Sequence, residues 1–75
     1  MTPREIIESL DCMVIGETAE RLGTLIWFRD NQTGTTLGMY AHHVTRDEAL
    51  FHVSVSRTSF YLENQSKQPQ SGVPR

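Results

Sequence analysis

Residues 24–40, "TLIWFRDNQTGTTLGMY", contain the clearest tertiary signal of the sequence. Two runs rich in β-branched, aromatic and aliphatic residues flank the turn-forming segment "DNQTG" at 30–34. Gly34 can adopt the left-handed backbone conformation that hairpin loops of this length often contain. The sequence therefore predicts an antiparallel β-hairpin whose loop lies at residues 30–34.

This hairpin has apolar residues on both of its faces. If Arg29 pairs with Thr35, side-chain alternation places Trp27 opposite Leu37 on one face. The other face then carries Ile26, Phe28 and Tyr40. One short helix cannot cover two sides of a sheet, so the second side requires either another helix or another protein chain.

The N-terminal segment predicts a short amphipathic helix that begins at Pro3. Thr2 can cap this helix, Pro3 fits the first helical position, and Glu5 can complete a capping box. Ile6, Ile7 and Leu10 then fall on one side. A helix of about two turns is not stable alone, so we expect it to dock on the sheet.

Two further segments have the composition of strands, "CMVIGE" at 12–17 and "LFHVSVS" at 50–56, where valine and serine alternate. Thr45 and Glu48 repeat the capping-box pattern, which predicts a short helix over residues 46–50. The segment "ETAERLG" at 17–23 fits either a helical turn or the tip of a long hairpin.

The predicted fold class is α+β. A short N-terminal helix packs on a three- or four-stranded antiparallel sheet, and a short helical turn precedes the last strand. Residues 1–63 form a single small domain, because 75 residues allow one domain at most. The polar segment 64–75, rich in Pro, Gln and Ser, is predicted to be a flexible tail.

Composition restricts the classes of function. The formal net charge is -2, and the arginines are interleaved with nine carboxylates, which disfavours a nucleic-acid module. Cys12 is the only cysteine, so no internal disulfide can form and a reducing cytoplasm is expected. The longest apolar runs have four residues, and the N-terminus lacks a signal-peptide pattern, so we expect neither export nor a membrane span.

The segment "YAHHVTRDEALFH" at 40–52 contains all three histidines and raises the question of a metal or catalytic site. His42 and His43 are adjacent, so on an extended segment they point to opposite sides, and no common zinc spacing includes His52. Convergence of these histidines with Cys12 in space remains open. We expect no metal, no cofactor and no enzymatic activity, with Cys12 as a buried thiol.

The hypothesis that remains is a small non-catalytic protein-binding module of the inhibitor, adaptor or regulator type, acting as a homodimer. Its predicted contact residues are Trp27, Phe28, Arg29 and Tyr40, because aromatic residues and arginine dominate interface energies. Trp27 could instead fill the core. The alternative function is a nucleic-acid-binding regulator that uses the aromatic residues of the sheet and the arginines.

Overall fold

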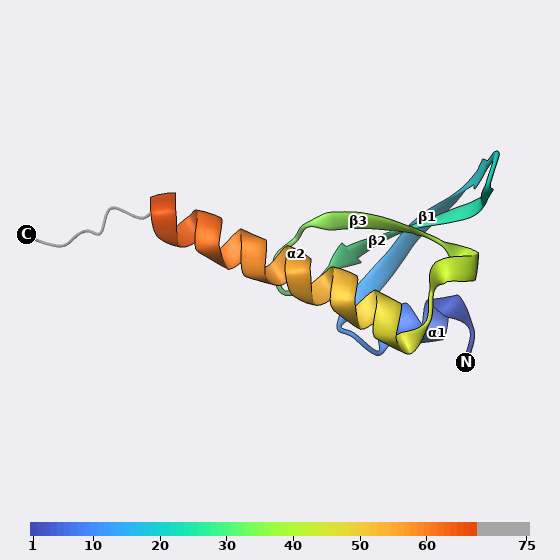
Figure 1. Cartoon of the computed structure of the whole chain (residues 1–75), viewed down its shortest axis with the longest axis horizontal. Helices are drawn as coiled ribbons and strands as arrows, with labels where there is room; N and C mark the ends of the chain where they lie inside the picture. Colours follow the sequence, from blue (N-terminus) through green and yellow to red (C-terminus); the bar gives the residue numbers. More distant parts are fainter. Residues whose placement is uncertain (68–75) are drawn as a thin grey trace, which may run out of the picture.

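The computed structural model describes residues 1–67 and confirms the α+β class (Figure 1). In chain order the elements are α1 (Pro3–Glu8), β1 (Cys12–Glu20), β2 (Gly23–Asp30), β3 (Thr36–Tyr40), the 3-10 turn η1 (Ala41–His43) and α2 (Arg46–Lys67). The strands form one antiparallel sheet in the order β1-β2-β3. Both β1 and β3 are therefore edge strands.

The start of α1 is the predicted capping box. The Thr2 hydroxyl accepts a hydrogen bond from the Glu5 backbone N–H at 3.2 Å, and the Glu5 carboxylate accepts one from the Thr2 backbone N–H at 2.8 Å. This bond from the Thr2 backbone holds the pKa of Glu5 below its ordinary value. Ile6 and Ile7 are buried against the sheet, which is the docking that a two-turn helix requires.

The segment 17–23 is the tip of a long hairpin and contains no helical turn. Glu20 pairs with Gly23, so only Arg21 and Leu22 lie between β1 and β2. Gly23 has a φ of 135°, which a residue with a Cβ rarely adopts. In Figure 1 this hairpin extends past the rest of the sheet as an arm.

The loop between β2 and β3 forms where the sequence predicts it. Gly34 has a φ of 75°, and its N–H donates to the Asp30 carbonyl at 2.8 Å. The Asp30 N–H donates to the Thr35 carbonyl at 2.9 Å, so Thr35 belongs to the loop closure. The predicted register is wrong by one residue, because Arg29 pairs with Thr36 and not with Thr35.

This shift changes which β2 and β3 residues share a face. Phe28 lies opposite Leu37 and Trp27 lies opposite Gly38. A slip of one residue moves every side chain of a strand to the other face, so Leu37 and Met39 join the Phe28 face. Tyr40, which was expected on the Phe28 face, pairs with Leu25 and joins the Trp27 face. The apolar surface of β3 is consequently buried with Phe28, and Trp27 faces a glycine.

Both helices cover the same face of the sheet. The buried residues form one cluster in which α1, α2 and that face all take part: Ile6, Ile7, Cys12, Ile26, Phe28, Met39, Val44, Ala49 and Val53. The second helix that the sequence required is thus present, but it lies beside α1. The face of β2 that carries Trp27 remains open.

The segment 50–56 is helical, so the prediction of a fourth strand is wrong. The Thr45 hydroxyl accepts the Glu48 backbone N–H at 3.2 Å, which is the expected start, but the helix continues through Lys67. It buries Ala49 and Val53, which are four residues apart and lie on one side of a helix. Tertiary packing thereby overrides the strand propensity of the alternating valines. Residues 64–67 of the predicted tail are helical, and the rest of that tail, 68–75, lies outside the described residues.

One buried ion pair joins α2 to the sheet. Asp30 is fully buried, and its two carboxylate oxygens accept bonds from Arg57 Nε at 2.8 Å and from a terminal Arg57 nitrogen at 2.9 Å. The same arginine donates to the Leu10 carbonyl at 2.7 Å, and the Gln32 N–H donates to Asp30 at 2.9 Å. Hydrogen bonding from Arg57 lowers the pKa of Asp30, and Asp30 raises the pKa of Arg57. The pair therefore stays charged and fixes α2 against the loops at Leu10 and Gln32.

Candidate functional site

The open face of the sheet carries a group of exposed apolar residues around Trp27. Trp27 is 38% exposed, and β1 adds Met13 and Ile15, each about half exposed. Ile15 is the extra residue of a β-bulge next to Gly16, the residue that pairs with Trp27. Arg29 follows Trp27 by two residues and lies on the same face. We call Met13, Ile15, Trp27 and Arg29 the open-face patch.

The indole of Trp27 is held in place from both neighbouring strands. Its Nε1–H donates to the Thr18 hydroxyl of β1 at 2.9 Å. On the other side the ring lies over Gly38 of β3, where a methyl group would come within 3.0 Å of the ring carbon Cζ3. A large aromatic surface is therefore presented to solvent in one fixed orientation, so it would lose little rotamer entropy on binding.

Arg29 supplies the positive charge of the patch. It is exposed and pairs in the sheet with Met13 and Thr36, both of which are exposed. The ion pairs found within residues 1–67 are formed by other side chains. A guanidinium at the rim of an aromatic surface can bind a carboxylate or a phosphate on a partner.

The structure places three of the four predicted contact residues on the open face of the sheet. Trp27 and Arg29 share the open face, whereas Phe28 is fully buried under the helices and has no accessible surface for a partner. Tyr40 pairs with Leu25, two residues before Trp27, so it lies on the open face as well. It is half-buried at the end of β3, where its ring stacks on His42 with centroids 5.6 Å apart. Met13 and Ile15 were missed because sequence alone does not locate a bulge.

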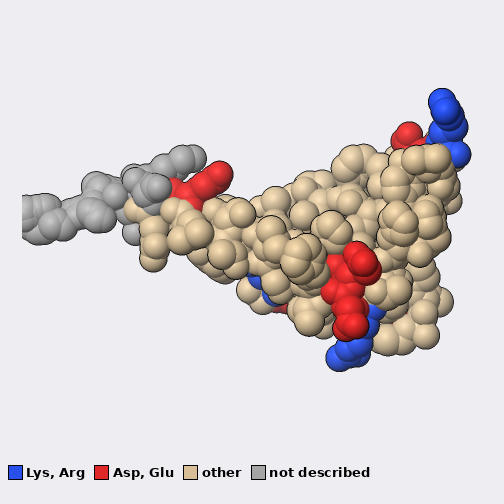
Figure 2. Space-filling view, in the orientation of Figure 1, with Lys and Arg blue, Asp and Glu red and all other residues tan. Residues whose placement is uncertain are grey.

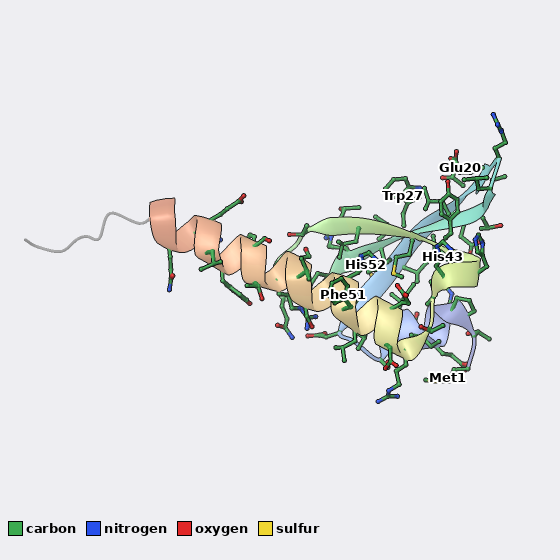
Figure 3. The ribbon with its side chains drawn as sticks, viewed as in Figure 1. Met1, Glu20, Trp27, His43, Phe51 and His52 are labelled. Atoms are coloured by element: carbon green, nitrogen blue, oxygen red, sulfur yellow. The ribbon has the colours of Figure 1, made fainter. Side chains whose placement is uncertain are left out.

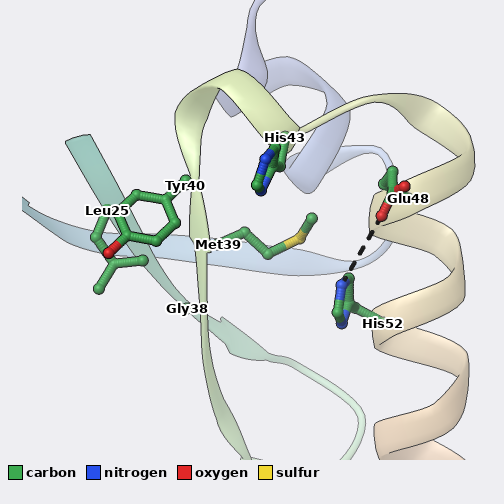
Figure 4. Close-up of a pocket in the computed structure, with 7 residues that line it drawn as sticks. All are labelled: Leu25, Gly38, Met39, Tyr40, His43, Glu48 and His52. Atoms are coloured by element: carbon green, nitrogen blue, oxygen red, sulfur yellow. Dashed lines mark ion pairs between the residues drawn. The ribbon is translucent and has the colours of Figure 1, made fainter. Parts of the chain in front are cut away.

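Two of the histidines line a small pocket beside β3. The pocket has a volume of about 220 Å³, and His43 and His52 lie across it from each other, with Met39 between them (Figure 4). His52 Nε2 is 4.0 Å from a Glu48 carboxylate oxygen, one helical turn away. Within residues 1–67 no group of three or more histidine, cysteine or acidic side chains is arranged to hold a metal ion. The pocket offers no converging set of ligands.

Cys12 lies apart from the histidines. It is buried, its Sγ is 3.6 Å from the Leu10 carbonyl oxygen, and burial raises the pKa of the thiol, with the Asp30 charge adding to the effect. A raised pKa leaves little thiolate at neutral pH, and the thiolate is the reactive form. The environment is that of a structural thiol.

A second apolar surface lies on the outer side of α2, away from the sheet. Its members are Phe51, Val55 and Leu62, all at least about half exposed, with Thr58 between them. We call these four residues the α2 seam. The seam was not predicted, because residues 50–56 were expected to form a strand. The intervals of four, three and four residues between its members nevertheless indicate one side of a helix. Figure 3 shows Phe51 on α2 and Trp27 on the sheet, well separated.

Comparisons with protein-family models, with curated proteins and with solved structures give no significant match to this chain. None of the helices within residues 1–67 combines the length and the apolar character that crossing a membrane requires.

Proposed function

We propose that this chain is a non-catalytic protein-binding module whose partner docks on the open-face patch. The observation that carries the proposal is the fixed and partly exposed Trp27, held by Thr18 on one side and Gly38 on the other. Tryptophan is the residue type most enriched among those that dominate interface energies, and a preorganised side chain has less entropy to lose. Inhibitor, adaptor and regulator roles all fit this mode of action.

The chemistry of the patch defines the kind of partner. Met13, Ile15 and Trp27 offer apolar surface, and Arg29 offers one guanidinium at its edge. The complementary surface is an apolar patch of a protein with a carboxylate placed to meet Arg29. The aromatic and aliphatic contacts supply affinity, and the ion pair supplies orientation.

The proposal includes a homodimer and a cytoplasmic location. A domain of this size buries a small core, and a second subunit is one of the usual ways to stabilise such a domain. The single cysteine is consistent with a reducing compartment, because the chain cannot form an internal disulfide.

Affinity capture from an extract of the source cells, with matched variants, tests the partner-binding role. The full chain is immobilised as wild type, as Trp27→Ala and as Leu22→Ala, a control at the exposed hairpin tip. We expect one protein to be retained in stoichiometric amount by wild type and by Leu22→Ala, and to be lost with Trp27→Ala. Retention by all three would exclude Trp27 as the anchor.

The nucleic-acid alternative rests on one local feature, the position of Arg29 beside Trp27 on an open sheet. It requires that an oligonucleotide bind and that its affinity fall steeply as salt is raised. The protein-binding proposal requires little affinity for the same oligonucleotide at physiological salt. A fluorescence-anisotropy titration with single-stranded RNA and DNA at two salt concentrations separates the two.

A further inference from the structure

We infer that the α2 seam binds a second copy of this chain through antiparallel pairing of the two α2 helices. This inference rests on the homodimer of the proposed function and adds the interface and its geometry. The open-face patch remains free for the other partner, because the patch and the seam lie on different sides of the molecule (Figure 3).

The seam has the spacing of a coiled-coil interface. Phe51, Val55, Thr58 and Leu62 follow one another at intervals of four, three and four residues, the alternation of the two core positions of a heptad. Phe51 is 64% and Leu62 is 60% exposed, so the two largest members have most of their surface in contact with solvent. On the opposite side of the same helix, Val53 is fully buried and Arg57 forms the pair with Asp30.

The surface of the seam contains a depression that can receive a side chain of a second helix. A depression of about 360 Å³ is lined by Phe51, Ser54, Val55, Thr58 and Ser59. Four of these residues stand at positions i, i+3, i+4 and i+7, which is the arrangement that receives one side chain of a facing helix. Ser54 and Ser59 are small, so a second helix can approach closely at this point.

Lack of charge makes the seam complementary to itself. Between Glu48 and Glu63 the only charged residue of α2 is Arg57, and it faces the sheet and pairs with Asp30. Figure 2 shows the corresponding uncharged band along the middle of α2. A surface that meets its own copy must avoid like charges at the contact, and an uncharged seam meets this condition.

The direction of pairing follows from the ends of the seam. In a parallel pair Glu48, one heptad before Val55, would face its own copy and repel it. In an antiparallel pair centred between Val55 and Thr58, Phe51 faces Leu62 of the second copy and Glu48 faces the neutral Gln65. Antiparallel helices also bring opposite ends of their macrodipoles together.

The far side of α2 leaves room for this partner. The sheet and α1 lie on the inner side of α2, and the C-terminal part of the helix projects past the sheet (Figure 1). A second helix on the seam therefore meets no part of the first copy except α2. The dimer would have four layers, with the two sheets outermost and the two open-face patches directed outward.

Molar mass in solution by size-exclusion chromatography with light scattering tests the interface on the full chain. We expect wild type to have twice the chain mass of 8.6 kDa. Phe51→Glu and Leu62→Glu should each raise the dimer dissociation constant by at least about tenfold, because each buries a charge in an apolar contact. Leu22→Glu, which places the same charge at another exposed leucine, should remain dimeric. Circular dichroism verifies the fold of each variant, and both seam residues are exposed enough in the monomer for folding to persist.

Each outcome of this experiment is decisive. A monomeric wild type would overturn the homodimer and the inference together, and would leave the Trp27 proposal to its own capture test. A dimer that survives both seam substitutions would overturn the inference and keep the homodimer. Trp27→Ala, measured in the same way, then shows whether that dimer forms through the open face.

Spin labels test the antiparallel direction. The label is attached through Arg46→Cys at the exposed start of α2, while Cys12 is buried. Residues 46 and 67 are the ends of the helix, so antiparallel pairing separates the two labels by about 30 Å along the axis at 1.5 Å per residue. Labels within about 15 Å of each other, near the spacing of adjacent helices, would overturn the antiparallel arrangement.

Discussion

The two faces of the sheet differ in whether their large side chains are enclosed. On the covered face Phe28 is fully buried, and the charged Asp30 beside it receives hydrogen bonds from Arg57 and from the Gln32 backbone. On the open face Trp27 is held as firmly, by Thr18 and Gly38, yet it keeps more than a third of its surface in contact with solvent. Burial holds the side chains of the covered face in place, whereas Trp27 on the open face is held in place without being fully buried.

Stabilising residues and binding residues of a small fold can be separated by comparing how each is held in place. A residue that is fixed because it is enclosed contributes mainly to folding. A residue that is fixed but exposed has already lost conformational freedom without gaining full burial, and a partner can supply the missing contact.

The largest effect is expected on the covered face, from Arg57→Leu. Removing the guanidinium leaves Asp30 as an unpaired buried charge, and the loss should be about 3–5 kcal/mol in the free energy of unfolding. Urea denaturation followed by circular dichroism measures it. The control is Arg4→Ala, which breaks the exposed pair with Glu8 and should cost less than about 0.5 kcal/mol. Equal losses in the two variants would mean that the Asp30 pair does not anchor α2.

A dependence on pH should accompany the same pair. The pKa of Asp30 in the folded chain lies below its ordinary value of 3.8, so its contribution is fully present above that value. The contribution is lost as the pH falls through the folded pKa, and wild type should lose stability below about pH 4. In Arg57→Leu the buried carboxylate keeps the Gln32 N–H but has no countercharge, so protonation removes an unpaired buried charge and the acid loss should be smaller. Urea titrations between neutral and acid pH would contradict this if the two curves ran parallel.

On the open face, Gly38→Ala should change the free energy of unfolding little but should change the environment of the Trp27 indole. Gly38→Ala places a methyl group 3.0 Å from the ring and should displace the indole, whereas Gly16→Ala meets no atom within 4 Å. Trp27 is the only tryptophan, so its fluorescence reports the site without interference. We expect a red-shifted emission and stronger acrylamide quenching for Gly38→Ala alone. An unchanged spectrum would show that the ring is not held by contact with Gly38.

The smallest effect concerns Cys12 on the covered face. Burial and the raised pKa of the thiol should make its reaction with Ellman's reagent slow at neutral pH in the folded chain and fast in urea. No group on the open face should alter this rate, so Trp27→Ala should leave it unchanged. Rapid reaction in the native state would indicate that the covered face opens frequently.

The sequence could predict the parts of this fold that depend on local chemistry. Thr2, Pro3 and Glu5 predict the start of α1 because a capping box involves only neighbouring residues. The loop ending at Gly34 was predictable for the same reason. The register between β2 and β3 could not be predicted, because Thr35 and Thr36 are chemically alike. Which of them pairs with Arg29 depends on the hydrogen bond from the Asp30 N–H to the Thr35 carbonyl.

The helix α2 and the candidate surfaces depend on tertiary structure. Apolar residues occur both on the side of α2 that carries Val53 and on the side that carries Phe51, so no single periodicity stands out. Trp27 and Arg29 were predicted as contact residues from their types. The sequence could not show that Phe28 is buried, because the buried face of the sheet depends on where α2 docks. The ion pair that holds α2 joins Asp30 and Arg57, which are 27 positions apart.

Fluorine NMR of the chain labelled with 5-fluorotryptophan can show whether a partner docks on Trp27. Trp27 gives the only resonance, and the sample is titrated with the protein that the wild-type chain captures. We predict that this resonance shifts to a bound position and saturates at the stoichiometry measured by calorimetry. Calorimetric binding that leaves the resonance unmoved would contradict the assignment of the open-face patch as the partner site.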